Sequence, residues 1–135
     1  MAALPWRDEY LINVAVIDEQ HQRLAELVNR LHETFASNQT GEDVFMALNE
    51  LIGFTRLHFA TEEELMIKYE YPDYAAHRIA HKTLLSRLQG LLTTLRDQSP
   101  FRIGGSNEID DDWVTRHLLE SDVALGKFLN KKGVF

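Results

Sequence analysis

Residues 58–81 read HFATEEELMIKYEYPDYAAHRIAH, and this stretch decides the fold that we expect for the chain. Its middle contains Tyr71-Pro72, which ends one helix and begins the next, because proline disfavours helix in the residue before it and suits a first helical turn. On either side lie two polar pairs: His58 with Glu62, and His77 with His81. Residues four apart share one face of a helix, so the stretch predicts two antiparallel helices that each present a polar pair.

Apolar residues recur at helical spacing in four stretches of the chain, and turn signals separate these stretches. The predicted helices cover about residues 18–37, 42–70, 72–96 and 108–130. Asp18 is the expected N-cap of the first helix, and residues 1–17 form an extended arm anchored by Trp6. Mostly short connections imply antiparallel neighbours. The expected fold class is therefore all-α, an up-down-up-down antiparallel four-helix bundle in one domain over residues 1–135.

The composition is that of one globular domain and argues against several classes of protein. The chain has 135 residues, 44% of them hydrophobic, and a net charge of −7 without clustered Lys and Arg, which argues against nucleic-acid binding. No apolar run is long enough to cross a bilayer, and residues 1–6 do not resemble a signal peptide. We expect a cytoplasmic monomer. Because the chain has no cysteine, any metal must bind histidine and carboxylate.

Five of the six histidines and two carboxylates fall on inward faces of the predicted helices. These residues are His21, His58, Glu62, His77, His81, His117 and Asp122. In an antiparallel bundle all seven reach one layer, roughly one to three and a half turns inside the same end. His32 lies on much the same face as His21, but eleven residues further on and hence about 16 Å away, so it cannot join them.

A single inward histidine is usually a core residue bonded to a backbone carbonyl, and we keep this interpretation for His32. Two buried carboxylates are a different case, because burying them without partners is very costly and no inward Lys or Arg is predicted at their level. A centre of two divalent ions removes this cost. The neighbouring Glu63 and Glu64 are interpreted as part of a solvated face, although Glu63, at the edge of the inward face, is also a candidate partner for a ligand.

The ordered motifs resemble those of the bacterial hemerythrins, from Trp6 to about Leu129. The motifs are Ile17-Asp18-Glu19-Gln20-His21, His58-Phe59-Ala60-Thr61-Glu62-Glu63, Tyr71-Pro72 with His77-x-x-x-His81, and Trp113-Val114-x-x-His117-Leu118-x-x-x-Asp122. The chain departs from the pattern at Gly104-Gly105, which interrupts a stretch where relatives usually already form the fourth helix. No ligand of the pattern is missing.

The resemblance implies a single hemerythrin-like domain that holds two non-haem iron ions. One iron would bind His77, His81 and His117, and the other would bind His21 and His58. Glu62 and Asp122 would bridge the two irons beside an oxo or hydroxo bridge. The second iron would keep one open position, where dioxygen binds reversibly. The apolar residues that the resemblance places around this position are Phe59, Trp113, Val114 and Leu118, although Phe59, Trp113 and Leu118 also fit a plain core.

The expected function is reversible dioxygen binding, for oxygen storage or for delivery to an oxygen-requiring client enzyme, so the chain is not expected to be an enzyme. One alternative is a di-iron enzyme with peroxidase-like activity. Such bundles typically use Glu-x-x-His on two helices, and no ligand position here shows that motif. The other alternative is a module for iron handling or for sensing oxygen, nitric oxide or redox state. Sensors usually carry a further domain, for which 135 residues leave no room.

Overall fold

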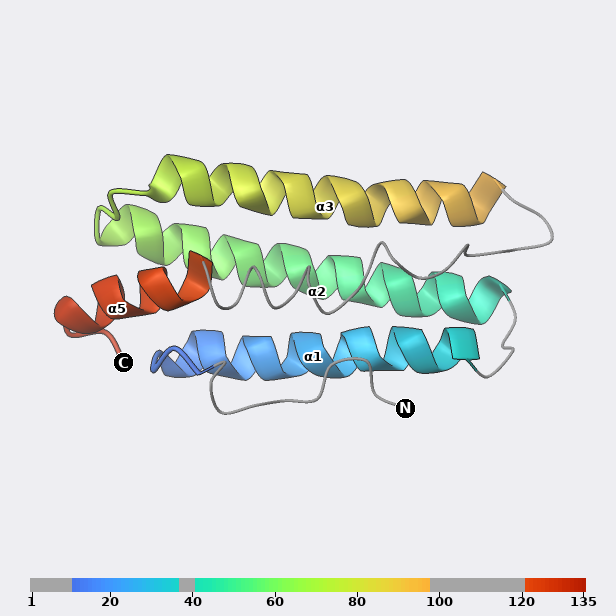
Figure 1. Ribbon diagram of the computed structural model, residues 1–135, viewed down its shortest axis with the longest axis horizontal. Helices are drawn as coiled ribbons and strands as arrows, with labels where there is room; N and C mark the ends of the chain where they lie inside the picture. The colour runs from blue at the N-terminus through green and yellow to red at the C-terminus, as the bar shows by residue number, and fades with distance from the viewer. Residues whose placement is uncertain (1–10, 37–40, 98–120) are drawn as a thin grey trace.

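The computed structural model describes residues 11–36, 41–97 and 121–135, which form helices with no strand among them. Three long helices lie side by side: α1 (Ala15–Ala36), α2 (Gly41–Lys68) and α3 (Tyr74–Asp97). A shorter helix, α5 (Val123–Lys131), lies at one end of this layer (Figure 1). The predicted all-α class is confirmed for these residues.

Contacts between α1 and α2 show that these two helices run in opposite directions. Gln20 Nε2 donates to Thr61 Oγ1 at 3.1 Å, and further along α1 Arg30 Nη1 donates to Glu50 Oε2 at 2.9 Å. Residue numbers therefore rise along α1 as they fall along α2. Figure 1 shows the same relation between α2 and α3, whose neighbouring ends are joined by residues 69–73.

The predicted start of the first helix is wrong, because α1 begins at Ala15 and Asp18 lies inside its first turn. The backbone N–H of Asp18 donates to the Val14 carbonyl at 2.9 Å, so the helical bonding already begins at Val14. The Asp18 carboxylate instead accepts the N–H of Ile12 at 2.7 Å. An acidic residue in the first turn still favours the positive end of the helix dipole.

The predicted arm over residues 1–17 therefore loses its last residues to α1, and what the structure describes of it is residues 11–14. These bend at Asn13, whose φ of 63° lies in the left-handed region that asparagine tolerates. Trp6 lies outside the described residues. Asn130 Nδ2 donates to the Asn13 carbonyl at 2.9 Å, which ties this segment to α5.

The turn between α2 and α3 also differs from the prediction, since α2 ends at Lys68 and not at Glu70. Glu70 adopts a φ of 55°, its N–H donates to the Ile67 carbonyl, and the Tyr71 N–H donates to the Met66 carbonyl at 2.9 Å. This is a Schellman motif, which caps the carbonyls that a helix end leaves open. The helix is therefore closed by backbone bonds before Pro72 is reached.

α3 begins two residues later than predicted, at Tyr74. Pro72 lies in the preceding turn, where the Tyr74 N–H donates to the Tyr71 carbonyl at 3.2 Å. The first i to i−4 bond of the helix runs from His77 to Asp73 at 3.0 Å. Proline at the second position of a turn has its φ already set, so it shapes the connection and does not start the helix.

The predicted fourth helix, about 108–130, falls partly outside the described residues. Its described part is a wider π-type turn at residues 121–122 followed by α5, which runs to Lys131. Gly104-Gly105 lie outside the described part of the chain.

Two apolar clusters form the core of the described residues. The long-helix cluster joins α1, α2 and α3, with buried residues Leu24, Ala25, Leu27, Val28, Leu31, Val44, Ala47, Leu48, Leu51, Ile52, Leu88 and Leu91. The arm cluster joins the first described residues, the 69–73 turn and α5, with buried residues Ile12, Val14, Ile17, Met66, Tyr71, Leu125 and Leu129. A layer of buried polar side chains separates the two clusters. On α1 this layer contains His21, which lies between Ile17 and Leu24. On α2 it contains Thr55, His58 and Glu62, which lie between Ile52 and Met66.

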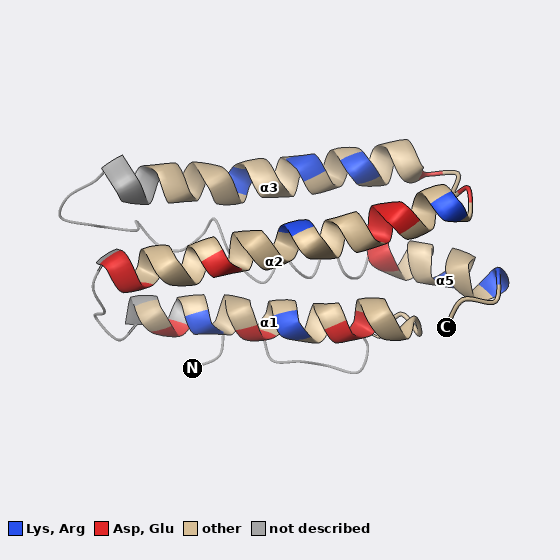
Figure 2. Cartoon of the chain, turned by 180° about the vertical axis from the view of Figure 1, so that it is seen from behind, with Lys and Arg blue, Asp and Glu red and all other residues tan. Residues whose placement is uncertain are grey.

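Figure 2 shows charged residues of both signs along α1 and α2, whereas the part of α3 that is coloured carries Lys and Arg only. Arg23 and Arg30 of α1 both pair with Glu50 of α2, at 3.3 and 2.9 Å. Such half-exposed pairs each contribute at most about 1 kcal/mol. Among the described helices, none combines the length and apolar character that crossing a membrane requires.

Candidate metal centre

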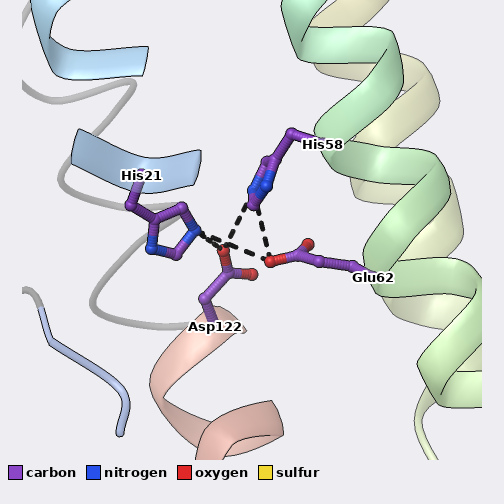
Figure 3. A group of neighbouring side chains, drawn as sticks. All are labelled: His21, His58, Glu62 and Asp122. Carbon is purple, nitrogen blue, oxygen red and sulfur yellow. Dashed lines mark hydrogen bonds and ion pairs between the residues drawn. The ribbon is translucent and has the colours of Figure 1, made fainter. Parts of the chain in front are cut away.

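Six of the seven predicted ligands lie together in the buried polar layer between the two apolar clusters. They come from four helical segments: His21 from α1, His58 and Glu62 from α2, His77 and His81 from α3, and Asp122 from the turn before α5. Each side chain is at most 5% exposed. Figure 3 shows four of them pointing toward a common centre. The seventh, His117, lies outside the described residues.

Glu62 divides its two carboxylate oxygens between two pairs of histidines. Oε2 lies 3.3 Å from His58 Nε2 and 3.6 Å from His21 Nε2. Oε1 lies 2.9 Å from His81 Nε2 and 3.2 Å from His77 Nε2. The carboxylate therefore faces both pairs at once, with one oxygen toward each.

Asp122, in the turn before α5, repeats this division. Its Oδ2 lies 2.6 Å from His21 Nε2 and 3.8 Å from His58 Nε2, whereas its Oδ1 lies 3.0 Å from His77 Nε2. The Asp122 side chain makes no capping hydrogen bond to α5, although the residue precedes that helix. The π-type turn thus leaves this carboxylate directed into the cluster, and such turns are frequent at functional sites.

The donor atoms form two groups of four that share both carboxylates: His21, His58, Glu62 and Asp122, and Glu62, His77, His81 and Asp122. Within each group the atoms lie within 4.8 Å of one another. Two atoms bound to one ion at about 2.1 Å lie up to about 4.2 Å apart, so each group is close to the spacing that one ion requires. Imidazole and carboxylate donors suit iron, zinc and other first-row metals. The residues therefore fit a centre of two ions.

The charges of the cluster shift the pKa values of its members strongly. Burial lowers the pKa of His58, but Glu62 and Asp122 outweigh burial and raise it to about 9. His77 shows the same balance, with its pKa also raised to about 9. Burial raises the pKa of Glu62, yet His58 and the other imidazoles hold it well below its ordinary value. Protons on His58 and His77 therefore offset the charge of the carboxylates when no metal is bound, and metal binding must release them.

Two of the histidines have a described partner on the ring nitrogen that faces away from the cluster. His58 Nδ1 lies 2.9 Å from Gln20 Oε1, and His81 Nδ1 lies 3.0 Å from Glu63 Oε2. An acceptor at Nδ1 keeps the proton there and leaves the Nε2 lone pair for a metal. The sequence favoured a solvated face for Glu63, and only its position at the edge of the inward face left contact with a ligand as an alternative. The sequence gave no role to Gln20, although this residue directly precedes the predicted ligand His21 and so had to lie near the cluster.

Phe59, predicted to line the dioxygen position, lies directly against the cluster. Its side chain is buried, and its ring stacks on His81 with centroids 3.8 Å apart and an angle of 3° between the planes. The other three predicted lining residues, Trp113, Val114 and Leu118, lie outside the described residues. His32 belongs to α1, but its side chain lies outside what the structure describes.

In the described part of the chain, helices surround buried histidines that share two carboxylates, an arrangement typical of helical bundles that bind metals. The chain matches the family described as Hemerythrin HHE cation binding domain over residues 13–128. It is 33% identical to a bacteriohemerythrin of Stenotrophomonas maltophilia, covering 92% of this chain and 80% of that relative. The chain belongs to the hemerythrin family, which confirms the family that its motifs predicted.

Other relatives and solved structures agree with this assignment. A bacteriohemerythrin of Methylococcus capsulatus is 32% identical, covering 96% of this chain and 99% of that relative. Two crystal structures of hemerythrin mutants superpose with a TM-score of 0.85 at 28% identity, covering 96% of this chain and 98% of theirs. The likeness therefore extends over nearly the full length of the compared chains.

Proposed function

We propose that the cluster holds two iron ions and binds dioxygen reversibly, so that the protein stores oxygen or delivers it to an oxygen-requiring enzyme. In this proposal His21 and His58 hold one iron, and His77, His81 and His117 hold the other. The proposal includes a single domain, an up-down-up-down bundle, and a monomer in the cytoplasm. When bound, the two irons would supply the electrons that dioxygen takes up reversibly.

The observation that carries the proposal is the division of each carboxylate between two histidine pairs. Glu62 places Oε2 near His58 and Oε1 near His81, and Asp122 makes a parallel division between His21 and His77. A carboxylate that binds a single ion does not require a histidine donor beside each of its two oxygens. Two carboxylates that both bridge indicate two ions held close together.

The donor set supports a carrier over an oxygen-activating enzyme. Four described histidines surround two carboxylates, so imidazole supplies most of the donors. Neutral imidazoles stabilise high-valent iron less well than anionic carboxylates do, and this difference favours binding that can be reversed. Glu62 lies four residues after His58, and Asp122 lies in the turn before α5. Neither carboxylate belongs to a Glu-x-x-His motif, the pattern of carboxylate-rich di-iron enzymes.

The burial of the cluster supports reversibility for a second reason. The six described ligands are almost inaccessible, and Phe59 covers one face of His81 with a flat apolar ring. A dry surrounding limits the access of water and protons to a bound ligand, and so slows side reactions that would leave the iron oxidised. In the proposal Trp113, Val114 and Leu118 complete this apolar surrounding.

Anaerobic reconstitution with Fe²⁺ tests the proposal. The ferrous protein should develop a visible absorption band when oxygen is admitted and lose it under inert gas, over repeated cycles. An irreversible change accompanied by turnover of an added reductant would overturn the carrier function in favour of an enzyme. Metal analysis of the same sample should give two irons per chain, and a single zinc per chain would overturn the centre itself.

A further inference from the structure

We propose that Glu63, paired with Arg78, is a positioning residue that orients His81 and places negative charge beside one of the two metal positions, whereas Gln20 gives His58 at the other position a neutral partner. The two positions are thus made chemically unequal by residues that do not touch the metal. This inference rests on the proposed dinuclear centre and concerns how the chain tunes it.

Both ring nitrogens of His81 are engaged, and this fixes the direction of the ring. Nδ1 lies 3.0 Å from Glu63 Oε2, while Nε2 lies 2.9 Å from Glu62 Oε1. The stacked Phe59 ring supports the same imidazole from its face. Because a carboxylate accepts but does not donate, the proton is on Nδ1 when Nε2 presents its lone pair to a metal in the cluster.

Glu63 is itself held at the edge of the bundle by a cation from α3. Arg78 Nε lies 3.6 Å from Glu63 Oε1, the oxygen that does not face His81. The Glu63 side chain is 25% exposed and the Arg78 side chain 50% exposed. Glu63 therefore remains partly in contact with water, so its carboxylate avoids the cost of full burial. Its charge reaches the cluster through the His81 ring.

Gln20, the corresponding partner of His58, is neutral, and so are the groups to which Gln20 is hydrogen-bonded in turn. His58 Nδ1 donates to Gln20 Oε1 at 2.9 Å, and Gln20 Nε2 donates to Thr61 Oγ1 at 3.1 Å. The Thr61 hydroxyl in turn donates to the Leu57 carbonyl at 3.0 Å. This chain of amide, hydroxyl and carbonyl groups orients the ring but adds no negative charge.

The difference in charge has a predictable consequence for the two positions. A carboxylate bonded to a ligating imidazole raises the basicity of that ligand, and it stabilises a more highly charged ion. The metal position at His77 and His81 should therefore bind its ion more tightly than it would if the partner of His81 were a neutral amide. For the same reason it should favour the oxidised state of that ion. Removing an outer partner of this kind typically costs about 10- to 100-fold in metal affinity.

Two reciprocal substitutions test the inference in the iron-loaded protein. Glu63→Gln keeps an acceptor for His81 and removes the charge, so the reduction potential of the di-iron centre should rise. Gln20→Glu adds a charge beside His58, so the potential should fall. Glu63→Ala should lower the affinity for Fe²⁺, measured by anaerobic calorimetry, by about 10- to 100-fold. Glu64→Gln, an exposed neighbour with the same change of charge, is the matched control and should change neither quantity.

Opposite shifts in Glu63→Gln and Gln20→Glu would support the inference, because a merely structural role gives no reason for opposite signs. Shifts of the same sign, or a shift in Glu64→Gln equal to that in Glu63→Gln, would overturn it. Arg78→Gln, at a half-exposed side chain, should lower the potential because it removes the cation that partly offsets the charge of Glu63. If the unsubstituted protein fails to take up two irons, the proposed function fails, whereas normal loading with unshifted variants contradicts only this inference.

Discussion

The two apolar clusters on either side of the polar layer are built in different ways. The long-helix cluster consists of aliphatic residues from α1, α2 and α3, helices of 22, 28 and 24 residues. The buried residues of the arm cluster instead come from residues 12–17, Met66 near the end of α2, the turn at Tyr71, and α5. Tyr69, Tyr74 and Phe128 are partly buried against the arm cluster, whereas Phe54 is the aromatic residue partly buried against the long-helix cluster.

This difference shows which part of the molecule depends on the site. Asp122 joins the start of α5 to the cluster through His21 and His77. The arm cluster should therefore gain stability from a bound metal, whereas the long-helix cluster should be largely self-sufficient.

The largest effect on metal binding is expected at Glu62, whose carboxylate faces both histidine pairs. Glu62→Gln removes the charge that faces both histidine pairs, so iron-reconstituted protein should lose most of both ions by metal analysis. His32→Ala, in the same layer of helices but about 16 Å along α1 from His21, should leave the metal content unchanged. Full iron loading of Glu62→Gln would show that this carboxylate does not bridge.

Removal of the metal should destabilise the arm cluster more than the long-helix cluster. Treating the iron-loaded protein with a chelator should increase amide hydrogen exchange most in α5 and residues 12–17, and least around Val28 and Leu48. Ligand-linked stabilisation reaches about 4 kcal/mol at a free metal concentration of about 1,000 times the dissociation constant. A uniform increase along the chain would contradict the proposed difference between the clusters.

A pair of core substitutions should sharpen the same comparison. Leu48 and Leu125 are both fully buried, one in each cluster, and replacing either by alanine should cost about 2–5 kcal/mol of unfolding free energy. Leu125→Ala should also weaken iron binding because Leu125 lies one helical turn from Asp122, whereas Leu48→Ala should leave the iron content at two per chain. Denaturant unfolding and metal analysis measure the two effects, and equal iron loss in both would contradict the distinction.

The smallest effect is expected at two glycines. A Cβ on Gly126 would lie 2.7 Å from the Ile12 carbonyl oxygen, so Gly126→Ala should displace the arm and cost about 1–3 kcal/mol. A Cβ on Gly53, in the middle of α2, would meet nothing within 4 Å, and Gly53→Ala should add about 0.5–1 kcal/mol. Thermal unfolding of both variants measures the difference. Stabilisation by Gly126→Ala would show that the arm does not pack closely on α5.

Much of the candidate site could be predicted because its residues are set by spacing within single helices. His58 and Glu62, and likewise His77 and His81, share faces through their four-residue separation, whatever the neighbouring helices do. Helix ends were less predictable. Asp18 has the side chain of an N-cap, but the packing of Ile12 and Val14 in the arm cluster continues the helix back to Ala15.

By itself, the sequence determined the all-α class, the inward faces of the helices and the histidines and carboxylates on them, because helical periodicity is a local property. Only the tertiary structure decided which oxygen of Glu62 faces which histidine, and that Gln20 of α1 contacts His58 whereas Glu63 of α2 contacts His81. These contacts depend on the register between helices and on side-chain rotamers. Both are set by how apolar residues far apart in the chain pack together, which no local pattern encodes.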